Sequence, residues 1–326
     1  MQTTKQELVR VENLSKQFSM GSSFLSKKKQ SIRAVEDLSF SIYKGETLGI
    51  VGESGCGKST TGRLLLRLLE ATSGSVHFEG EDITSFSKEQ LRAKRKDFQM
   101  IFQDPYASLN PRMTVEDLIS EPLVTYKVPN RKERVLELID AVGISKDYLN
   151  RYPHEFSGGQ RQRIGIARSL ALNPKFIIAD EPVAALDVSI QAQIINLMKD
   201  LQDEYDLTYL FIAHDLSVVE YISDRIAVMY LGNIVELTVS EKLYMRPLHP
   251  YTQALISAIP VPDPSLKRES VKLSGELPSP MNPPTGCKFH TRCPLAKDIC
   301  KQVVPQLKEV EPEHFVACHV VEENLV

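Results

Sequence analysis

The sequence predicts an α/β layered fold for residues 1–245, followed by an extension of different composition over 246–326. Short apolar segments alternate with amphipathic ones through the first part, as expected when strands and helices pack in layers. Nine of the chain's 19 prolines then lie between Pro247 and Pro284. That density predicts an extended, irregular segment there.

The composition favours a soluble chain and excludes several classes of protein. The 326 residues are 42% hydrophobic and 25% charged, with a net charge of −3. This balance argues against a nucleic-acid coat or an anionic membrane surface as the partner. No apolar run approaches the roughly 20 residues of a membrane span, and the N-terminus lacks a secretory signal. We therefore expect a cytosolic chain that takes any membrane role through a partner.

The expected elements follow from periodicity and from turn residues. Apolar stripes at helical spacing predict core-facing helices at Arg131–Val142 and Ile190–Leu201. The polar stretch Met20–Ser31, with three consecutive lysines, is predicted to be a surface loop. Four strands are predicted, at Thr47–Val51, Phe98–Phe102, Phe176–Ala179 and Tyr209–Ala213.

A phosphate-binding loop follows the first of these strands. The stretch fits G-x-x-x-x-G-K-[ST] in full, and a helix-like KSTTGRLLLRLL comes after it. That context makes a chance glycine-rich turn the poorer interpretation. Backbone amides would curl round the β-phosphate, Lys58 would reach the β and γ phosphates, and the Ser59 hydroxyl would bind Mg²⁺. The nucleotide-binding residues expected here are Gly52, Glu53, Ser54, Gly55, Cys56, Gly57, Lys58, Ser59 and Thr60.

Polar side chains also stand at the ends of three other predicted strands. Parallel strands end at one edge of a sheet, beside such a loop. Asp180 suits a water-mediated hold on Mg²⁺, and Glu181 is our candidate general base for the attacking water. His214 would reach the γ-phosphate side, and Gln103 would contact Mg²⁺ or the lytic water.

A second stretch, HEFSGGQRQR, also has the features of a phosphate cradle. Ser157 would cap a helix that begins at Gly158–Gly159 and ends before Asn173-Pro174. Arg161 and Arg163 would make its first turn basic. One nucleotide per domain is already held by the first loop, so this second cradle needs another explanation.

The last 40 residues hold four of the five cysteines, with the spacing C-x5-C-x6-C-x17-C and with His290 and His319 nearby. Four thiolates can bind Zn²⁺ or a [4Fe–4S] cluster, although the C-x2-C knuckle typical of zinc sites is missing. Buried, unliganded cysteines are the third possibility. The four are Cys287, Cys293, Cys300 and Cys318, whereas Cys56 fits a small filler of the first loop.

Taken in order, these motifs resemble those of ABC-type ATPases: the first loop, Gln103, SGGQ at Ser157–Gln160, FIIADE at Phe176–Glu181, Leu186-Asp187 and His214. The resemblance implies a RecA-like P-loop NTPase core with an antiparallel β subdomain and a helical subdomain at about 104–172. It also implies a head-to-tail dimer, in which Ser157, Gly158, Gly159, Gln160 and Asp187 face the ATP of the partner subunit. Phe18 matches the aromatic that stacks on adenine, with a strand-core aromatic as the alternative.

Three further stretches resemble the peptide/nickel importer branch, most like its ATP-binding subunit designated F: residues 102–111, residues 249–255 and the cysteine tail. The resemblance implies an energy-coupling ATPase for di- or oligopeptide import, peripheral on the cytoplasmic face of the membrane. Its partners would be a related second ATPase, two membrane-spanning permeases and, indirectly, an extracytoplasmic binding protein. Some tails of this kind carry an iron–sulfur cluster, which favours [4Fe–4S] over Zn²⁺ here.

One residue departs from the family pattern, and two other functions stay in view. The family has serine where Ala184 stands, so one cross-interface hydrogen bond, worth about 1 kcal/mol, is lost. A soluble ABC ATPase acting on nucleic acid or ribosomes usually has two cassettes or a long coiled coil, and this sequence shows neither. A metal-responsive regulator would have its main activity in the tail, residues 285–326.

Overall fold

The structure is a computed structural model that describes residues 5–19, 31–259, 273 and 275–324 of the chain. Except for Ser31, the predicted loop Met20–Ser31 lies outside the described residues, as does the proline-rich stretch 260–272. The chain divides into two compact units. We call residues 7–42, 48–84 and those from Ala213 onward the β-rich unit, and residues 5–6, 43–47 and 85–212 the helix-rich unit.

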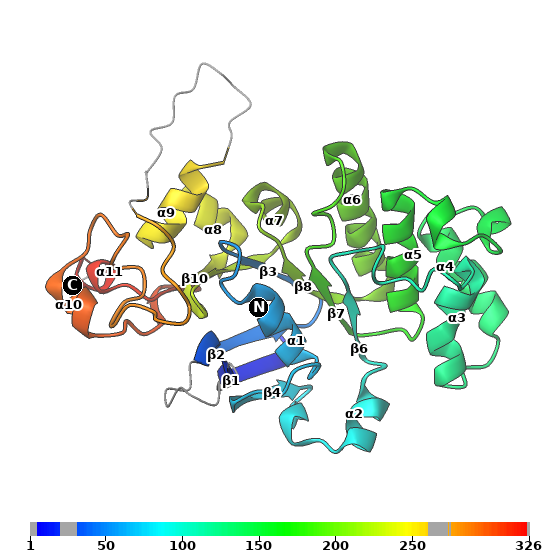
Figure 1. Ribbon diagram of the computed structural model, residues 1–326, viewed down its shortest axis with the longest axis horizontal. Coiled ribbons are helices and arrows are strands. Elements are labelled where there is room, and N and C mark those ends of the chain that lie inside the picture. Colours follow the sequence, from blue (N-terminus) through cyan, green and yellow to red (C-terminus); the bar gives the residue numbers. More distant parts are fainter. Residues whose placement is uncertain (1–4, 20–30, 260–272, 274, 325–326) are drawn as a thin grey trace, which may run out of the picture. The chain divides into compact units, whose positions relative to one another are not determined.

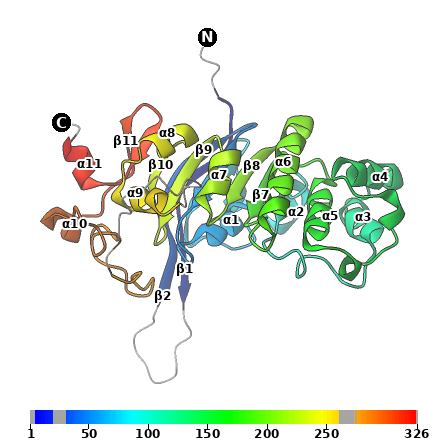
Figure 2. The ribbon, with the colours of Figure 1, turned by 90° about the horizontal axis from the view of Figure 1, so that it is seen from above.

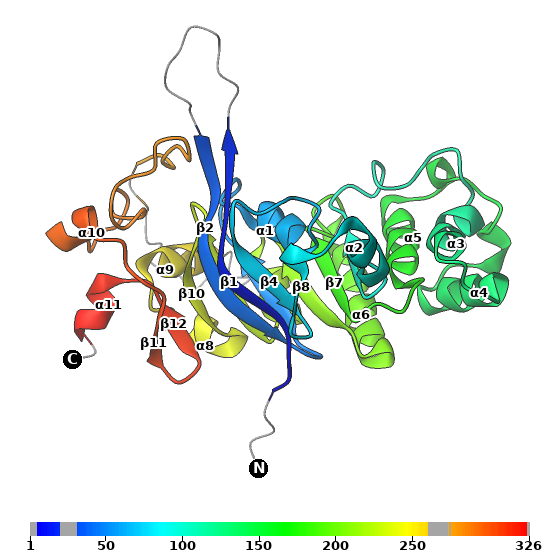
Figure 3. The same ribbon diagram turned by 90° about the horizontal axis from the view of Figure 1, so that it is seen from below.

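The β-rich unit contains an antiparallel sheet with the strand order β2-β1-β4-β5. Figure 3 shows β2, β1 and β4 side by side. Val9 of β1 pairs with Phe78 of β4, and both side chains are buried. The apolar side chains of this sheet are buried on one face, as is usual for an antiparallel sheet. The strands are β1 (Glu7–Ser19), β2 (Ser31–Tyr43), β4 (Ser73–Phe78) and β5 (Glu81–Asp82).

A second sheet in the β-rich unit begins with β3 (Thr47–Val51), which confirms the predicted strand. All five of its residues are buried, which explains the uninterrupted apolar run TLGIV. It pairs in parallel with β9, and antiparallel pairing continues through β10 and β12 to β11. The other elements are α1 (Lys58–Leu65), α7 (Leu216–Ile222), β9 (Arg225–Tyr230) and β10 (Asn233–Val239).

The helix-rich unit has three parallel strands in the order β6-β7-β8. They are β6 (Phe98–Ile101), β7 (Phe176–Asp180) and β8 (Thr208–Ile212), so the predicted strands are confirmed to within one residue at each end. Ile101 lies opposite Ala179. The residues that follow β6 and β7 therefore leave the sheet at the same edge.

Three helices of the helix-rich unit pack against one another, as Figures 1 and 2 show. They are α3 (Val115–Thr125), α4 (Arg131–Ala141) and α5 (Gly158–Leu170), with short 3-10 turns at Lys146–Tyr148 and Pro153–Glu155. Thr114 begins α3 through a reciprocal capping box with Asp117. The apolar stripes of α3 and α4 are buried, as the sequence predicts for α4.

Two more helices complete this unit: α2 (Lys88–Lys94) and α6 (Val188–Tyr205). The helix predicted at Ile190–Leu201 is confirmed and runs further at both ends. Ile194, Met198 and Leu201 are buried on one face of α6 while its other face is polar, so the helix is amphipathic. Within the described ranges, no helix has both the length and the apolar character that crossing a bilayer demands.

The chain beyond residue 239 is more regular than the sequence predicts. Residues 275–297 contain no helix or strand, but β12 extends the second sheet by pairing with β10. A fully buried Glu236 of β10 accepts bonds from the backbone N–H groups of Leu248 and His249 and contacts His314 Nε2 at 2.7 Å. The elements are α8 (Ser240–Met245), α9 (Pro250–Ser257), α10 (Asp298–Gln302), β11 (Lys308–Glu311), β12 (His314–Val316) and α11 (His319–Asn324).

Candidate functional site

The glycine-rich loop Gly52–Thr60 joins β3 to α1, as the motif predicts. Gly52 and Gly57 have φ values of 155° and 109°, which side-chain-bearing residues rarely adopt. A Cβ atom on either would lie 2.2 Å from a backbone carbonyl oxygen, of Met229 and of Ala34 respectively. Backbone packing therefore requires glycine at both positions. Cys56 is 1% exposed, and burial raises the pKa of its thiol, so it fills the loop as the sequence suggests.

Lys58 is the first residue of α1, and its side chain is held over the loop. It is 5% exposed, and Nζ donates to the carbonyl oxygens of Gly52 at 2.7 Å and Glu53 at 3.3 Å. Gly57 has no side chain that could cap α1. The backbone N–H groups at the positive end of the helix dipole can therefore bind another acceptor. An ionised phosphate oxygen would be a stronger acceptor for this ammonium group than a neutral carbonyl.

His214 also belongs to the β-rich unit. The preceding residue, Ala213, donates its N–H to Ile50 of β3 at 3.2 Å, and His214 itself is exposed. The chain therefore emerges at His214 beside the strand that leads into the glycine-rich loop. The adjacent Asp215 has a structural role, because its Oδ1 caps α7 by accepting the N–H of Ser217 at 2.9 Å.

The helix-rich unit brings two predicted residues together at the edge of its strands. Gln103 Nε2 donates to Glu181 Oε2 at 2.8 Å, and both residues follow strands that run in parallel register. Glu181 has φ 47°, an uncommon left-handed conformation for a residue other than glycine, and its N–H donates to Ile212 at 2.9 Å. Such conformations persist where the surrounding structure holds them and cluster at functional sites. Asp180, the last residue of β7, is 2% exposed.

The SGGQ stretch begins α5, as predicted. Ser157 Oγ accepts the N–H of Gln160, and Gln160 Oε1 accepts the N–H of Ser157, so the two residues form a capping box. The two glycines have a packing role: a Cβ at Gly159 would lie 2.5 Å from Ile190 Cγ2, and one at Gly158 would lie 3.2 Å from Leu186. The glycines therefore let the segment around Asp187 approach the start of α5.

The two arginines expected to make the first turn of α5 basic are bonded to groups within the helix-rich unit. Arg161 is 7% exposed, and it donates to the carbonyl oxygen of Pro153 at 3.1 Å and to the Tyr106 hydroxyl at 2.6 Å. Its guanidinium also lies 3.6 Å from the centre of the Tyr106 ring. Arg163 donates to Val142 at 2.7 Å. Both guanidinium groups therefore brace the helix-rich unit, each through its own hydrogen-bond partners.

Two residues expected to meet nucleotide are exposed. Asp187 precedes α6, and its side chain makes no capping hydrogen bond. Phe18 of β1 is 37% exposed with the Lys16 ammonium 5.2 Å from its ring centre, so the alternative of a strand-core aromatic is wrong. The roles of Asp187 and Phe18 in nucleotide binding stay predictions.

Two residues in contact with the glycine-rich loop were missed by the sequence reasoning. Arg292 forms a bidentate ion pair with Glu53, and the Tyr251 hydroxyl accepts the N–H of Glu53 at 2.9 Å. Both come from the region after residue 245. Tyr251 belongs to the family-like stretch at residues 249–255, whereas Arg292 belongs to none of the motifs identified in the sequence. Neither position carries a local signal for this contact.

Cys287 lies close enough to the other three tail cysteines for their charges to affect its ionisation. Burial raises the pKa of Cys287 to about 11, and the charges of the other three add to this effect. The backbone N–H of Cys287 donates to the backbone carbonyl oxygen of Cys300 at 2.8 Å. His290 and His319 contact backbone carbonyl oxygens. In the described part of the chain, no three His, Cys, Asp or Glu side chains are arranged to hold a metal ion. The cluster and zinc alternatives thus stay predictions.

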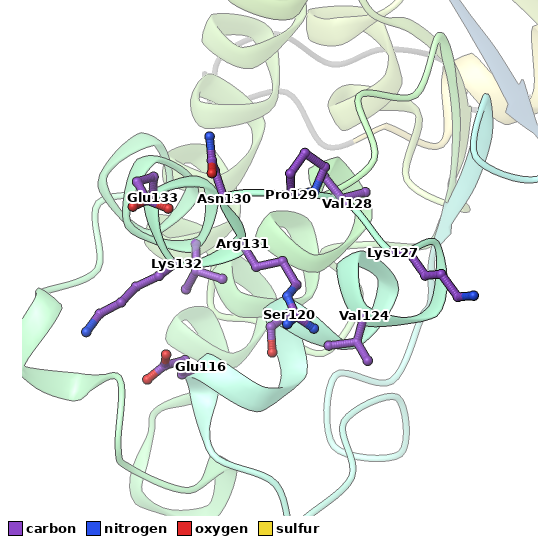
Figure 4. A pocket seen from close by; sticks show the side chains of 11 residues that line it. Glu116, Ser120, Val124, Lys127, Val128, Pro129, Asn130, Arg131, Lys132 and Glu133 are labelled. Carbon is purple, nitrogen blue, oxygen red and sulfur yellow. The ribbon is translucent and has the colours of Figure 1, made fainter.

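One cavity of about 650 Å³ lies in the helix-rich unit, between one side of α3 and the first turns of α4. Figure 4 shows the side chains that line it, Lys127 and Arg131 among them. No residue predicted to bind nucleotide or metal contributes to its wall. This cavity is therefore separate from the candidate site.

Comparisons with known proteins agree with this geometry. A family model described as "ABC transporter" matches residues 35–184, and one described as "Oligopeptide/dipeptide transporter, C-terminal region" matches residues 235–300. The chain is 58% identical over 322 residues to the Oligopeptide transport ATP-binding protein AppF of Bacillus subtilis (strain 168), covering 97% of this chain and 98% of the relative. It is 54% identical to the Probable peptide ABC transporter ATP-binding protein y4tS of Sinorhizobium fredii, covering 96% and 90%.

Solved structures support the same conclusion. The chain matches the ATP-binding cassette MJ0796, bound to ADP and Pi, with a TM-score of 0.63 and 30% identity, covering 72% of this chain and 99% of that one. It matches cbiO1 of Clostridium perfringens with a TM-score of 0.65 and 27% identity, covering 74% and 92%. The predicted fold class, a P-loop α/β core with antiparallel and helical parts, is confirmed. The chain belongs to the ABC transporter ATPases, in the branch that carries the oligopeptide/dipeptide transporter C-terminal region.

Proposed function

We propose that this chain hydrolyses ATP to drive the import of di- or oligopeptides. The observation that carries the catalytic part is the 2.8 Å hydrogen bond between Gln103 and Glu181 at the strand edge where Asp180 ends. Peptide as the transported class is supported by the names of relatives more than 50% identical, which are oligopeptide or peptide transport proteins.

Each residue of the site has a distinct task in this proposal. Lys58 stabilises the β and γ phosphates, and Glu181 accepts a proton from the attacking water. His214 contacts the γ-phosphate. Gln103, which is hydrogen-bonded to Glu181, responds to the presence of the γ-phosphate. Ser59 and Gln103 would supply oxygen ligands of the kind that Mg²⁺ prefers, and Asp180 would hold the ion through a water molecule. Mg²⁺ bound with ATP would neutralise charge that develops on the phosphates.

The SGGQ stretch would serve a second subunit. Ser157, Gly158, Gly159 and Gln160 begin α5, and the exposed Asp187 lies in the segment that packs near them. We assign these residues to the ATP bound by a partner ATPase, related to this chain, in a head-to-tail dimer. Loss of the γ-phosphate removes the charge that links the two subunits, so the dimer opens after hydrolysis.

The remaining partners follow from the transporter assignment. Two membrane-spanning permeases would receive the motion of the ATPase dimer, and an extracytoplasmic binding protein would deliver the peptide to them. The chain would then sit peripherally on the cytoplasmic face of the membrane. Its family match to a transporter C-terminal region supports this over a role on nucleic acid or ribosomes.

For the tail, the proposal is that Cys287, Cys293, Cys300 and Cys318 hold a [4Fe–4S] cluster, with Zn²⁺ as the alternative. The chemistry of the donor set supports it: four cysteines can bind a metal centre as thiolates, and a bound cation would offset the effects that raise the pKa of Cys287. The side chains would have to converge further to act as ligands.

The substitution Glu181→Gln tests the catalytic assignment. We expect it to retain ATP binding, to lower the hydrolysis rate at least 100-fold, and to accumulate an ATP-dependent dimer on gel filtration. Glu89→Gln, an exposed carboxylate at the start of α2, is the matched control and should behave as the unaltered protein. Near-normal turnover in Glu181→Gln would refute the role of Glu181.

A further inference from the structure

The C-terminal extension is attached to the glycine-rich loop by a two-point ion pair. Arg292 Nη1 and Nη2 donate to the two carboxylate oxygens of Glu53 at 2.7 and 3.1 Å. The Arg292 side chain is 8% exposed and that of Glu53 29%. The planar guanidinium matches a carboxylate in this geometry, which fixes orientation as well as distance.

A second contact holds the backbone of the same loop residue. The N–H of Glu53 donates to the Tyr251 hydroxyl at 2.9 Å, and Tyr251 is fully buried in α9. Its ring packs against Tyr230 at 4.8 Å and Phe289 at 5.4 Å between ring centres. Two separate parts of the extension therefore grip Glu53, one by its main chain and one by its side chain.

The position of Glu53 matters because the carbonyl groups on either side of its N–H bind Lys58. The carbonyl oxygens of Gly52 and Glu53 are the two acceptors of the Lys58 ammonium. The peptide unit between Gly52 and Glu53 thus contributes one group to Tyr251 and one to Lys58. A shift of this peptide would move the lysine that the phosphates need.

We propose that Arg292 and Tyr251 are positioning residues that hold the phosphate-binding loop in its competent shape and thereby set the affinity for ATP. This inference rests on the proposed assignment of Gly52–Thr60 as the nucleotide loop. Neither residue enters the chemistry at Glu181. Removing them therefore weakens nucleotide binding and leaves the rate at saturating ATP unchanged.

The test compares full-length variants by titration with a fluorescent ATP analogue and by steady-state hydrolysis. Arg292→Ala is expected to raise the Kd and the KM for ATP roughly tenfold while kcat stays within about twofold. Arg292→Lys, which keeps the charge but loses the fork, should recover part of the affinity. Tyr251→Phe removes only the acceptor oxygen and should raise the Kd in the same direction.

Lys288→Ala is the matched control, because Lys288 anchors the same extension without contacting the loop. Its Nζ contacts Glu36 at 2.7 Å and the carbonyl oxygen of Leu231 at 2.6 Å. Its variant should bind ATP as the unaltered protein does. An equal loss of affinity in Lys288→Ala would assign the effect to docking of the extension in general and overturn the proposal.

Two further results would also overturn it: unchanged ATP affinity in folded Arg292→Ala and Tyr251→Phe, or a fall in kcat with KM unchanged. Circular dichroism and the melting temperature identify folded variants. The assignment of the loop itself is tested separately by Lys58→Ala. If that variant bound ATP normally, the proposed nucleotide site would fail, whatever the Arg292 variants did.

Discussion

His249 is a buried histidine that the fold requires in its neutral form. Its Nδ1 accepts the N–H of Tyr251 at 3.1 Å, so this nitrogen carries no proton and caps the start of α9. The residue is 1% exposed, and burial lowers the pKa of His249 from 6.5 to about 4, although the nearby Glu236 opposes the shift. Acid should therefore destabilise the region that carries Tyr251.

The direction of this pH effect depends on whether the folded protein or the unfolded chain binds the proton first. Because the pKa of His249 is lower in the folded protein than in the unfolded chain, the unfolded chain takes up the proton first as the pH falls. The stabilisation is fully present above about pH 6.5 and declines progressively towards about pH 4. With these two values, linkage predicts a loss of about 2 kcal/mol in the free energy of unfolding by pH 5.

Urea unfolding at pH 7.5, 6.5, 5.5 and 5.0 measures this loss, with His249→Asn as the reference. Asparagine can cap the helix through its side-chain oxygen but does not titrate, so contributions from other groups cancel in the comparison. The difference in the free energy of unfolding between the two proteins should change by about 2 kcal/mol across the series, in favour of the variant at low pH. Parallel curves would show that His249 does not stay neutral in the folded protein and would refute the predicted pH dependence.

Two other predictions concern packing and metal content. Gly159→Ala should lower the free energy of unfolding by about 1–3 kcal/mol through overlap with Ile190, whereas Gly165→Ala, with open space at its Cβ, should not. Adding Ile190→Ala to Gly159→Ala should recover the lost stability. A Gly159→Ala variant as stable as Gly165→Ala would contradict the predicted overlap with Ile190. Cys293→Ser should remove iron, sulfide and the brown colour, whereas Cys56→Ser should keep them. Stoichiometric zinc in a colourless native protein would exclude the cluster.

The sequence determined those features that depend on neighbouring residues. The strand TLGIV, the glycine turns that follow it and the start of α1 could all be located, because backbone conformation and helix capping act over a few positions. The same holds for Ser157, whose capping box with Gln160 spans three residues. Glu181 and Gln103 could be placed at one edge because parallel strands end together.

Only the tertiary structure decided which side chains meet across long separations in the chain. Arg292 and Glu53 are 239 positions apart, and no local pattern pairs them. Arg161 was expected only to make the first turn of α5 basic, yet its guanidinium is buried in the helix-rich unit, where it donates to the Tyr106 hydroxyl. The direction of a side chain and the identity of its distant partner arise from packing, which periodicity in the sequence does not encode.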